Sequence, residues 1–379
     1  MSDTVVVEGF VAPGYEAVRA AFEDNFTLRG DVGASCAVHD GERFLVDLWS
    51  GDAAPGRSWS ADTLGLAFSV TKGLVTVLVA RLVDEGRLDL DEPVANYWPE
   101  FGTGGKAHTT VRMMLSHRAG LAVIDRGLDR RALMEPGAAS ARLAVQAPAW
   151  EPGTSFGYHA LTWGWLVDEM VLRVTGTRVR DLMQEKVGRL LGIDVHVGVP
   201  ADLVPRVADL EVGLAADAPV TAEQPPAEFM AALTAWGAFP LLDPPTWNDP
   251  DVRQASLPGA NVITNARSAA RLYAAVATDS PGAFVSRRVI DDFVVEQSAG
   301  RDRVTGFASR FGAGFMLPTA GNPMYSAASF GHEGVGGAQA FADLEAGIGF
   351  AYIQNSLRTA DGGDPRVFAL VDALRAARE

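Results

Sequence analysis

Apolar side chains that recur at every third or fourth position divide much of the chain into helical segments. The helices predicted on this basis span residues 13–26, 69–85, 111–116, 160–175, 179–191, 268–278 and 365–376. The segment 69–85 reads as a long amphipathic helix, and Gly86 follows it at the position where a glycine commonly ends a helix.

Short apolar runs, by contrast, predict strands close to both ends of the chain. The predicted strands span residues 34–39, 43–49, 311–317, 326–330, 337–343 and 348–354. Asp40, Gly41 and Glu42 separate the first two strands, which indicates a hairpin. Short connections between the last strands favour an antiparallel sheet. Two stretches rich in proline and acidic residues, 217–228 and 240–251, are predicted to be long surface loops.

This order of elements predicts an α+β fold, an α/β sandwich in which helices flank an antiparallel sheet built from both ends of the chain. We expect residues 1–100 and 255–379 to form one discontinuous sheet domain. Residues 101–254 would form a second, mainly helical domain.

Composition limits the partners of this protein. The 379 residues include 32 Lys and Arg against 47 Asp and Glu, so the formal net charge is −15. Nucleic-acid binding requires a basic surface, and an anionic membrane attracts basic rather than acidic proteins. We therefore expect neither nucleic acid nor a membrane as a partner.

Three features predict a cytoplasmic protein. The N-terminal residues contain no basic stretch followed by an apolar one, so no secretory signal is visible. The most apolar stretch, residues 74–83, is far shorter than the roughly 20 residues that span a bilayer. The single cysteine, Cys36, excludes an intramolecular disulfide and lies in a predicted strand, where we expect a buried and inert thiol.

Two serines are candidates for a catalytic nucleophile. The first is Ser69, which forms an S-x-x-K pattern with Lys72 at the start of a predicted helix. A step of three residues places both side chains on one helix face, where a lysine with a lowered pKa can take the serine proton. Free N–H groups at the helix N-terminus would stabilise an oxyanion. The alternative is an N-capping serine beside a solvated lysine.

Ser155 is the second candidate, because residues 153–157 (GTSFG) match the G-x-S-x-G pattern of α/β-hydrolases. That pattern requires a strand before the serine and a helix after it. Pro152 directly precedes the first glycine, and proline is disfavoured in a central strand. We therefore interpret Ser155 as a loop residue.

Four ordered blocks resemble the serine β-lactamase-fold enzymes, the group of class C β-lactamases and penicillin-binding proteins, and most closely the family VIII carboxylesterases. The blocks are 68–73 (FSVTKG), 114–121 (MLSHRAGL), 150–160 (WEPGTSFGYHA) and 330–337 (FGHEGVGG), within a resemblance that covers about residues 15–375. The resemblance implies a β-lactamase/transpeptidase-like fold with the active site between the two domains. It also implies a serine hydrolase that forms an acyl-enzyme.

The resemblance implies roles for individual residues. Ser69 would be the acylated nucleophile, with Lys72 as its partner. Tyr158 would exchange protons with the serine and later with the deacylating water. A Lys72 ammonium would stabilise the Tyr158 phenolate, and the pair would titrate together. The backbone N–H groups of Ser69 and Val335 would form the oxyanion hole.

The sequence departs from the lactamase pattern at the strand that lines the site. His332, Glu333 and Gly334 stand where lactamases carry K-T-G, and Ala160 stands at the asparagine of the Y-x-N block. A lysine would anchor a substrate carboxylate, whereas a histidine is largely neutral near pH 7. We therefore expect small neutral carboxylic esters as substrates. An amidase, β-lactamase or acyltransferase on the same fold is the alternative, and a non-catalytic binding protein is a further one.

The residues expected to bind substrate are His332, Gly334, Trp236 and Phe239. The two aromatic residues, together with Trp247, lie near the proline-rich segments and would line an apolar pocket, with core packing as the alternative. His332 has the alternatives of a hydrogen bond to Tyr158 or a space-filling role. No cluster with metal-ligand spacing and no nucleotide-binding motif occurs, so we expect neither a metal nor a cofactor.

Overall fold

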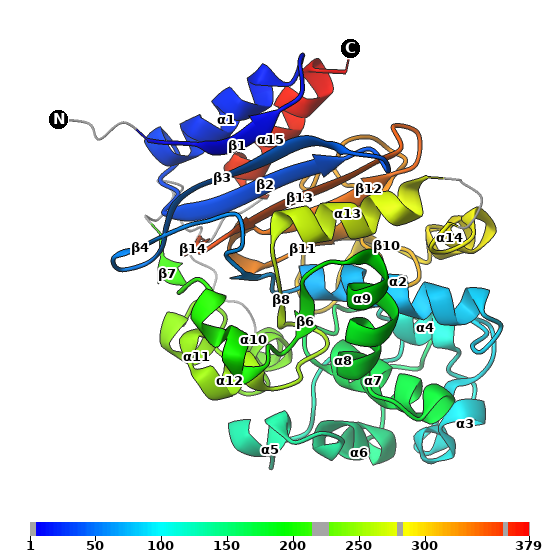
Figure 1. Cartoon of the computed structure of the whole chain (residues 1–379). Helices are drawn as coiled ribbons and strands as arrows, with labels where there is room; N and C mark the ends of the chain where they lie inside the picture. The colour runs from blue at the N-terminus through cyan, green and yellow to red at the C-terminus, as the bar shows by residue number, and fades with distance from the viewer. Residues whose placement is uncertain (1–4, 214–226, 279–282, 359–362, 379) are drawn as a thin grey trace.

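The computed structural model describes residues 5–213, 227–278, 283–358 and 363–378. Its main element is an antiparallel sheet in which strands from the two ends of the chain lie side by side (Figure 1). The strand order is β1 (Glu8–Val11), β3 (Phe44–Ala54), β2 (Gly33–His39), β13 (Ile348–Gln354), β12 (Gln339–Asp343) and β11 (Ser329–Glu333), and β4 (Arg57–Ser58) pairs with β3. The antiparallel sheet and its first hairpin are thereby confirmed.

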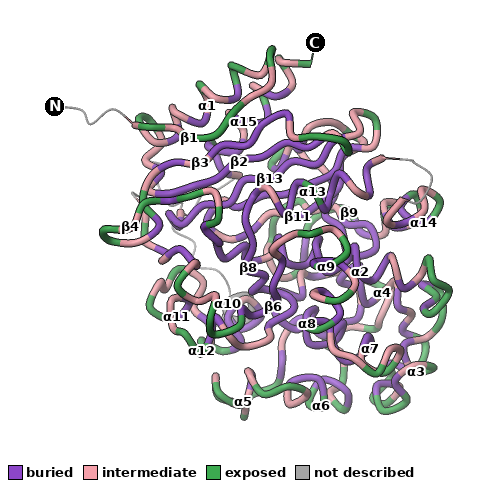
Figure 2. The backbone as a smooth tube through the Cα atoms, in the orientation of Figure 1, coloured by how far each residue is buried: buried purple, intermediate pink, exposed green. Residues whose placement is uncertain are grey.

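Helices cover both faces of this sheet. α1 (Glu16–Thr27) and α15 (Pro365–Ala376) pack together on one face, while α13 (Ala266–Ala277) and α2 (Val70–Asp84) lie on the other (Figure 1). β2 and β13 lie in the middle of the sheet, and every residue of both strands is buried (Figure 2). Burial on both faces explains why these strands are continuous apolar runs rather than alternating ones.

The middle of the chain is mainly helical and lies below the sheet in Figure 1. Its helices are α3 (Val94–Tyr97), α4 (Val111–Leu115), α5 (Arg130–Met134), α6 (Ala138–Val145), α7 (Thr162–Thr175), α8 (Val179–Leu182), α9 (Arg189–Leu191), α10 (Ala227–Thr234), α11 (Pro244–Asn248) and α12 (Pro250–Gln254), with a π-helical turn over Met183–Gly188 and 3₁₀ turns over Pro99–Gly102 and Ala201–Arg206. The division into domains at residues 100 and 255 stays a prediction.

Smaller elements connect these two parts. One small sheet has the order β5 (Gly65–Leu66), β8 (Val262–Thr264) and β6 (Val195–Val197), and it leads into the start of α2. The remaining elements are β7 (Glu211–Val212) paired with β14 (Ser356–Leu357), the hairpin of β9 (Ser298–Arg301) and β10 (Ala308–Phe311), α14 (Arg287–Phe293) and a 3₁₀ turn over Val335–Gly337. No helix in the described ranges has both the length and the apolarity needed to cross a membrane.

Several element predictions are corrected. α2 is not amphipathic: it is buried on nearly all sides, because the sheet covers one side and the helical region the other. Residues 240–251 are not a loop, since they contain α11 and the start of α12, each with an aspartate N-cap and a proline in its first turn. The strand expected over 311–317 ends at Phe311, where a turn through Gly312 and Gly314 follows. Residues 217–226 lie outside the described residues.

Candidate active site

Ser69 lies directly before α2, where the chain enters the helix. The preceding residue, Phe68, has a φ of 44°, a left-handed conformation that costs a non-glycine residue about 1–3 kcal/mol. The Ser69 hydroxyl makes no capping bond to the helix, so the N-cap alternative is wrong. The strained turn presents a half-buried hydroxyl that helix formation does not use.

Lys72 is fully buried one turn into α2, with its Nζ 3.1 Å from Ser69 Oγ. Nζ also lies 2.7 Å from the carbonyl oxygens of Ala160 and Gly259. No carboxylate of the described residues pairs with it, and burial lowers the pKa of Lys72 well below its usual value. In its neutral form, Lys72 would donate both N–H groups to the two carbonyls and keep its nitrogen lone pair for the Ser69 hydroxyl. This is the geometry of a general base.

Tyr158 lies on the other side of this pair. Its side chain lies close enough to Ser69 to interact with it, and Lys72 Nζ is 4.8 Å from the centroid of its ring. Burial, with the charges of Glu333 and Asp302, raises the pKa of Tyr158 well above its usual value. The tyrosine is therefore protonated in the free protein, and the lysine contacts its ring face rather than its oxygen. The expectation that a Lys72 ammonium stabilises a Tyr158 phenolate therefore does not hold for the free protein.

Asp302 fixes the backbone at Tyr158, and the sequence analysis missed it. Its Oδ1 accepts the N–H of Tyr158 at 3.1 Å and the N–H groups of Val304 and Thr305 at 2.8 Å. Asp302 is buried although no cation pairs with it in the described residues. Since 144 residues separate it from Tyr158, no local pattern marks this role.

The end of β11 passes against the residues that precede Ser69. A Cβ on Gly334 would lie 2.4 Å from the carbonyl oxygen of Ala67, so only glycine permits this approach. The N–H groups of Ser69 and Val335 donate none of the backbone hydrogen bonds found among the described residues. Both donors are therefore available for a developing oxyanion.

His332 is buried beside this site with its ring 6.0 Å from that of Tyr158. Its Nδ1 lies 2.7 Å from the carbonyl oxygen of Glu333 and must donate to it, so Nε2 carries the lone pair. Nε2 has no partner among the described residues. Burial lowers the pKa of His332 to about 3. The side chain is neutral, as expected, and cannot anchor a substrate carboxylate by charge.

Comparison with known proteins agrees with this geometry. The family model described as Beta-lactamase matches residues 20–374. The chain belongs to the β-lactamase family. The predicted β-lactamase/transpeptidase-like fold of the α+β class is thereby confirmed.

Relatives within this family cover nearly the whole chain. Esterase/beta-lactamase LipL of Mycobacterium tuberculosis is 35% identical over 373 residues, which cover 93% of this chain and 83% of that protein. A family VIII carboxylesterase of known structure has a TM-score of 0.88 at 35% identity, covering 98% of this chain and 100% of its own. EstA from Arthrobacter nitroguajacolicus Rue61a has a TM-score of 0.85 at 33% identity, covering 97% of both chains.

Ser155 does not lie in a strand–turn–helix elbow of the α/β-hydrolase type. This serine lies in an irregular segment, with a turn before it and α7 beginning only at Thr162. Trp150 Nε1 donates to its carbonyl oxygen at 3.0 Å. The interpretation of Ser155 as a loop residue is confirmed.

The aromatic residues expected to line a pocket have different environments. Trp247 packs edge to face against Phe68 with ring centroids 5.0 Å apart. Phe239 is fully buried behind Trp247, at 5.9 Å, and belongs to the core. Trp236 is 40% exposed, and the Arg126 guanidinium lies 3.8 Å from its ring centroid. Substrate contacts of Trp236 and Phe239 stay predictions, whereas Trp247 contacts Phe68 in the turn before Ser69.

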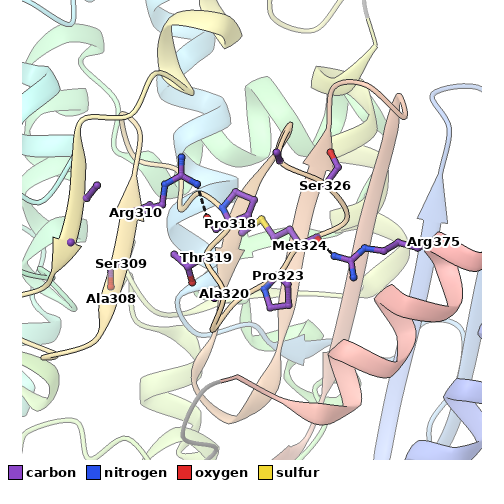
Figure 3. A pocket seen from close by; sticks show the side chains of 13 residues that line it. Ala308, Ser309, Arg310, Pro318, Thr319, Ala320, Pro323, Met324, Ser326 and Arg375 are labelled. Atoms are coloured by element: carbon purple, nitrogen blue, oxygen red, sulfur yellow. Dashed lines mark hydrogen bonds between the residues drawn. The ribbon is translucent and has the colours of Figure 1, made fainter.

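A cavity of about 630 Å³ lies between the β9–β10 hairpin and residues 318–327, with Arg375 of α15 at its rim (Figure 3). Arg310 crosses its wall and donates to the carbonyl oxygen of Pro318 at 2.7 Å. None of the expected site residues lines this cavity.

Proposed function

We propose that this protein is a serine carboxylesterase that cleaves small carboxylic esters through an acyl-enzyme on Ser69. The observation that carries the proposal is the 3.1 Å contact between Ser69 Oγ and a buried lysine with a lowered pKa. The similarity to a family VIII carboxylesterase and to EstA over nearly the whole chain supports an ester as the small-molecule substrate.

Acylation begins with proton transfer. The neutral Lys72 amine takes the Ser69 proton as Oγ attacks the ester carbonyl carbon. The N–H groups of Ser69 and Val335 stabilise the negative charge that develops on the carbonyl oxygen. Tyr158, which is protonated and lies close to Ser69, gives its proton to the leaving alkoxide. The Lys72 ammonium then restores the tyrosine proton.

Deacylation repeats these steps with water as the nucleophile. The Lys72 and Tyr158 pair removes a proton from the water as it attacks the acyl carbonyl, and then returns a proton to Ser69 Oγ. The same two amides hold the oxyanion. No metal or cofactor takes part in this proposal.

The neutral state of His332 supports the ester class within this fold. A carboxylate of a β-lactam or peptide would meet an uncharged imidazole and the nearby acid Glu333. We further propose that the site lies between the discontinuous sheet domain and the mainly helical domain. The cytoplasmic location expected from the sequence stays a prediction.

Paired substitutions of the two serines test this function. Ser69→Ala should lower kcat/KM on p-nitrophenyl acetate by about 10⁴-fold or more and abolish labelling by a fluorophosphonate probe, because the nucleophile is lost. Ser155→Ala, the matched control, should keep both. Full activity in the Ser69 variant defeats the proposal. Faster hydrolysis of a cephalosporin or a peptide amide than of the ester would instead favour the lactamase or amidase alternative.

A further inference from the structure

Glu333 is a polar side chain near this site that the proposed mechanism leaves unused. It ends β11, which is the edge strand of the sheet, and it comes two residues before the oxyanion donor Val335. Its carboxylate forms no hydrogen bond or ion pair with the described residues, although the residue is half-buried. Ser69, Tyr158 and Val335 are half-buried as well, whereas Lys72 and His332 are enclosed. Glu333 is thus partly open to solvent, as Ser69 and Tyr158 are.

No cation in the described part of the chain forms an ion pair with this carboxylate. Its charge acts on Tyr158, which is neutral and protonated. His332, the preceding residue on β11, is neutral. Gln339 of β12 is the residue paired with Glu333 in the sheet register. Asp364, at the start of α15, acts on Glu333 and is itself ion-paired with Arg366 at 2.7 Å. Burial and the charge of Asp364 raise the pKa of Glu333 to about 7, so the site holds an acid that lacks a counterion.

We propose that Glu333 binds a cationic group of the substrate, so that esters bearing a quaternary ammonium or a protonated amine are preferred over neutral esters of the same shape. When the carbonyl oxygen of the ester lies between the amides of Ser69 and Val335, the rest of the substrate runs past residues 333–335. A positive group there supplies the missing counterion. This inference rests on the proposed carboxylesterase function and specifies its substrate class.

Two pairs of esters with matched shapes test this preference. On the alcohol side, a choline ester is compared with the 3,3-dimethylbutyl ester, in which carbon replaces the quaternary nitrogen. On the acyl side, an ester of trimethylglycine is compared with the same ester of 3,3-dimethylbutanoic acid. The measured quantity is the ratio of kcat/KM for the cationic ester to that for its neutral partner. Intrinsic reactivity cancels when this ratio is compared between enzyme variants.

Glu333→Gln should lower the ratio by about tenfold in at least one pair, because the amide keeps the shape and removes the charge. Glu345→Gln is the matched control, since Glu345 is an exposed acid at the turn between β12 and β13. Its ratios should equal those of the wild type. Equal ratios in the wild type and Glu333→Gln for both pairs overturn the proposal. If no ester acylates Ser69 at all, the carboxylesterase function itself has failed.

The pH dependence of the ratio provides a second readout. Neither quaternary ammonium titrates, and Tyr158 and His332 keep their neutral forms near pH 7. Glu333 is ionised above its pKa of about 7, so attraction for a cation is present above that pH and is lost below it. The wild-type ratio should rise from pH 6 to pH 8, whereas that of Glu333→Gln should stay flat. A flat wild-type ratio contradicts the proposal.

Discussion

Two of the buried cations among the described residues, Arg366 and Lys72, have different surroundings. Arg366, near the start of α15, is fully buried with its guanidinium 2.7 Å from carboxylate oxygens of both Asp31 and Asp364. Lys72, at the start of α2, is equally buried, but its partners are two carbonyl oxygens and the Ser69 hydroxyl. One cation has two counterions and the other has none.

This difference separates a structural cation from the amine that we propose as the general base. Although burial opposes it, the neighbouring Tyr352, Asp364 and Asp31 raise the pKa of Arg366, which stays charged. Burial without a counterion lowers the pKa of Lys72. A buried cation thus becomes a base when its neighbours are dipoles rather than charges.

The largest expected effect follows from making the lysine permanently charged. Lys72→Arg should lower kcat by about 10³-fold, because a guanidinium cannot take the Ser69 proton. Steady-state hydrolysis of p-nitrophenyl acetate measures the loss, and circular dichroism checks the fold.

Lys106 provides the matched control for that variant. It is also fully buried, and its Nζ lies 2.9 Å and 2.5 Å from the carbonyl oxygens of Thr103 and Gln146. Its ring neighbour is Phe101, at 5.4 Å, and no serine hydroxyl is bonded to it. Lys106→Arg should keep the activity of the folded protein. An equal loss in both variants would show that a larger buried cation, not the missing base, causes the effect.

The second prediction concerns stability, for which the substitution of Arg366 rather than that of Lys72 should have the larger effect. Arg366→Met leaves Asp31 and Asp364 buried without a cation, so it should lower the free energy of unfolding by about 3–5 kcal/mol. Lys72→Met removes an uncompensated buried amine and should leave the protein at least as stable as the wild type. Urea unfolding measures both. Comparable destabilisation by the two variants would contradict the prediction that Arg366 stabilises the fold and Lys72 does not.

The smallest effect is a dependence of stability on pH. Because the pKa of Lys72 is lower in the folded protein than in the unfolded chain, the unfolded chain binds more protons between those two values. In that window the stability of the wild type should rise with pH relative to Lys72→Met, by at most about 1.4 kcal/mol per pH unit. Parallel stability curves between neutral and alkaline pH would mean that the Lys72 pKa is not shifted.

Features encoded by neighbouring residues were predictable from the sequence. The Ser69 and Lys72 pair lies three residues apart on one helix, so the spacing itself predicts the contact. The last helix was predicted with the bounds that the structure shows, since an aspartate cap and a proline mark its start. The hairpin of β2 and β3 likewise follows from its turn residues.

Features that depend on distant residues were not predictable. The carbonyl partners of Lys72 come from positions 88 and 187 residues away, and 335 residues separate Arg366 from Asp31. Nothing in the local sequence marks Asp302 as the support of Tyr158. The burial of α2 was also missed, because periodicity cannot show that a helix is covered on two sides.

The sequence by itself determined which chemical groups are present and how they follow one another: a serine and a lysine one helical turn apart, a tyrosine in its block, and a histidine in place of a cationic anchor. Only the tertiary structure decided their protonation states. Folding buries Lys72 without a carboxylate and raises the pKa of Tyr158. It also leaves Glu333 without an ion-pair partner among the described residues, two positions before Val335, the proposed oxyanion donor. The reason is that desolvation and charge pairing depend on distances in space, which these residues acquire only when remote segments pack together.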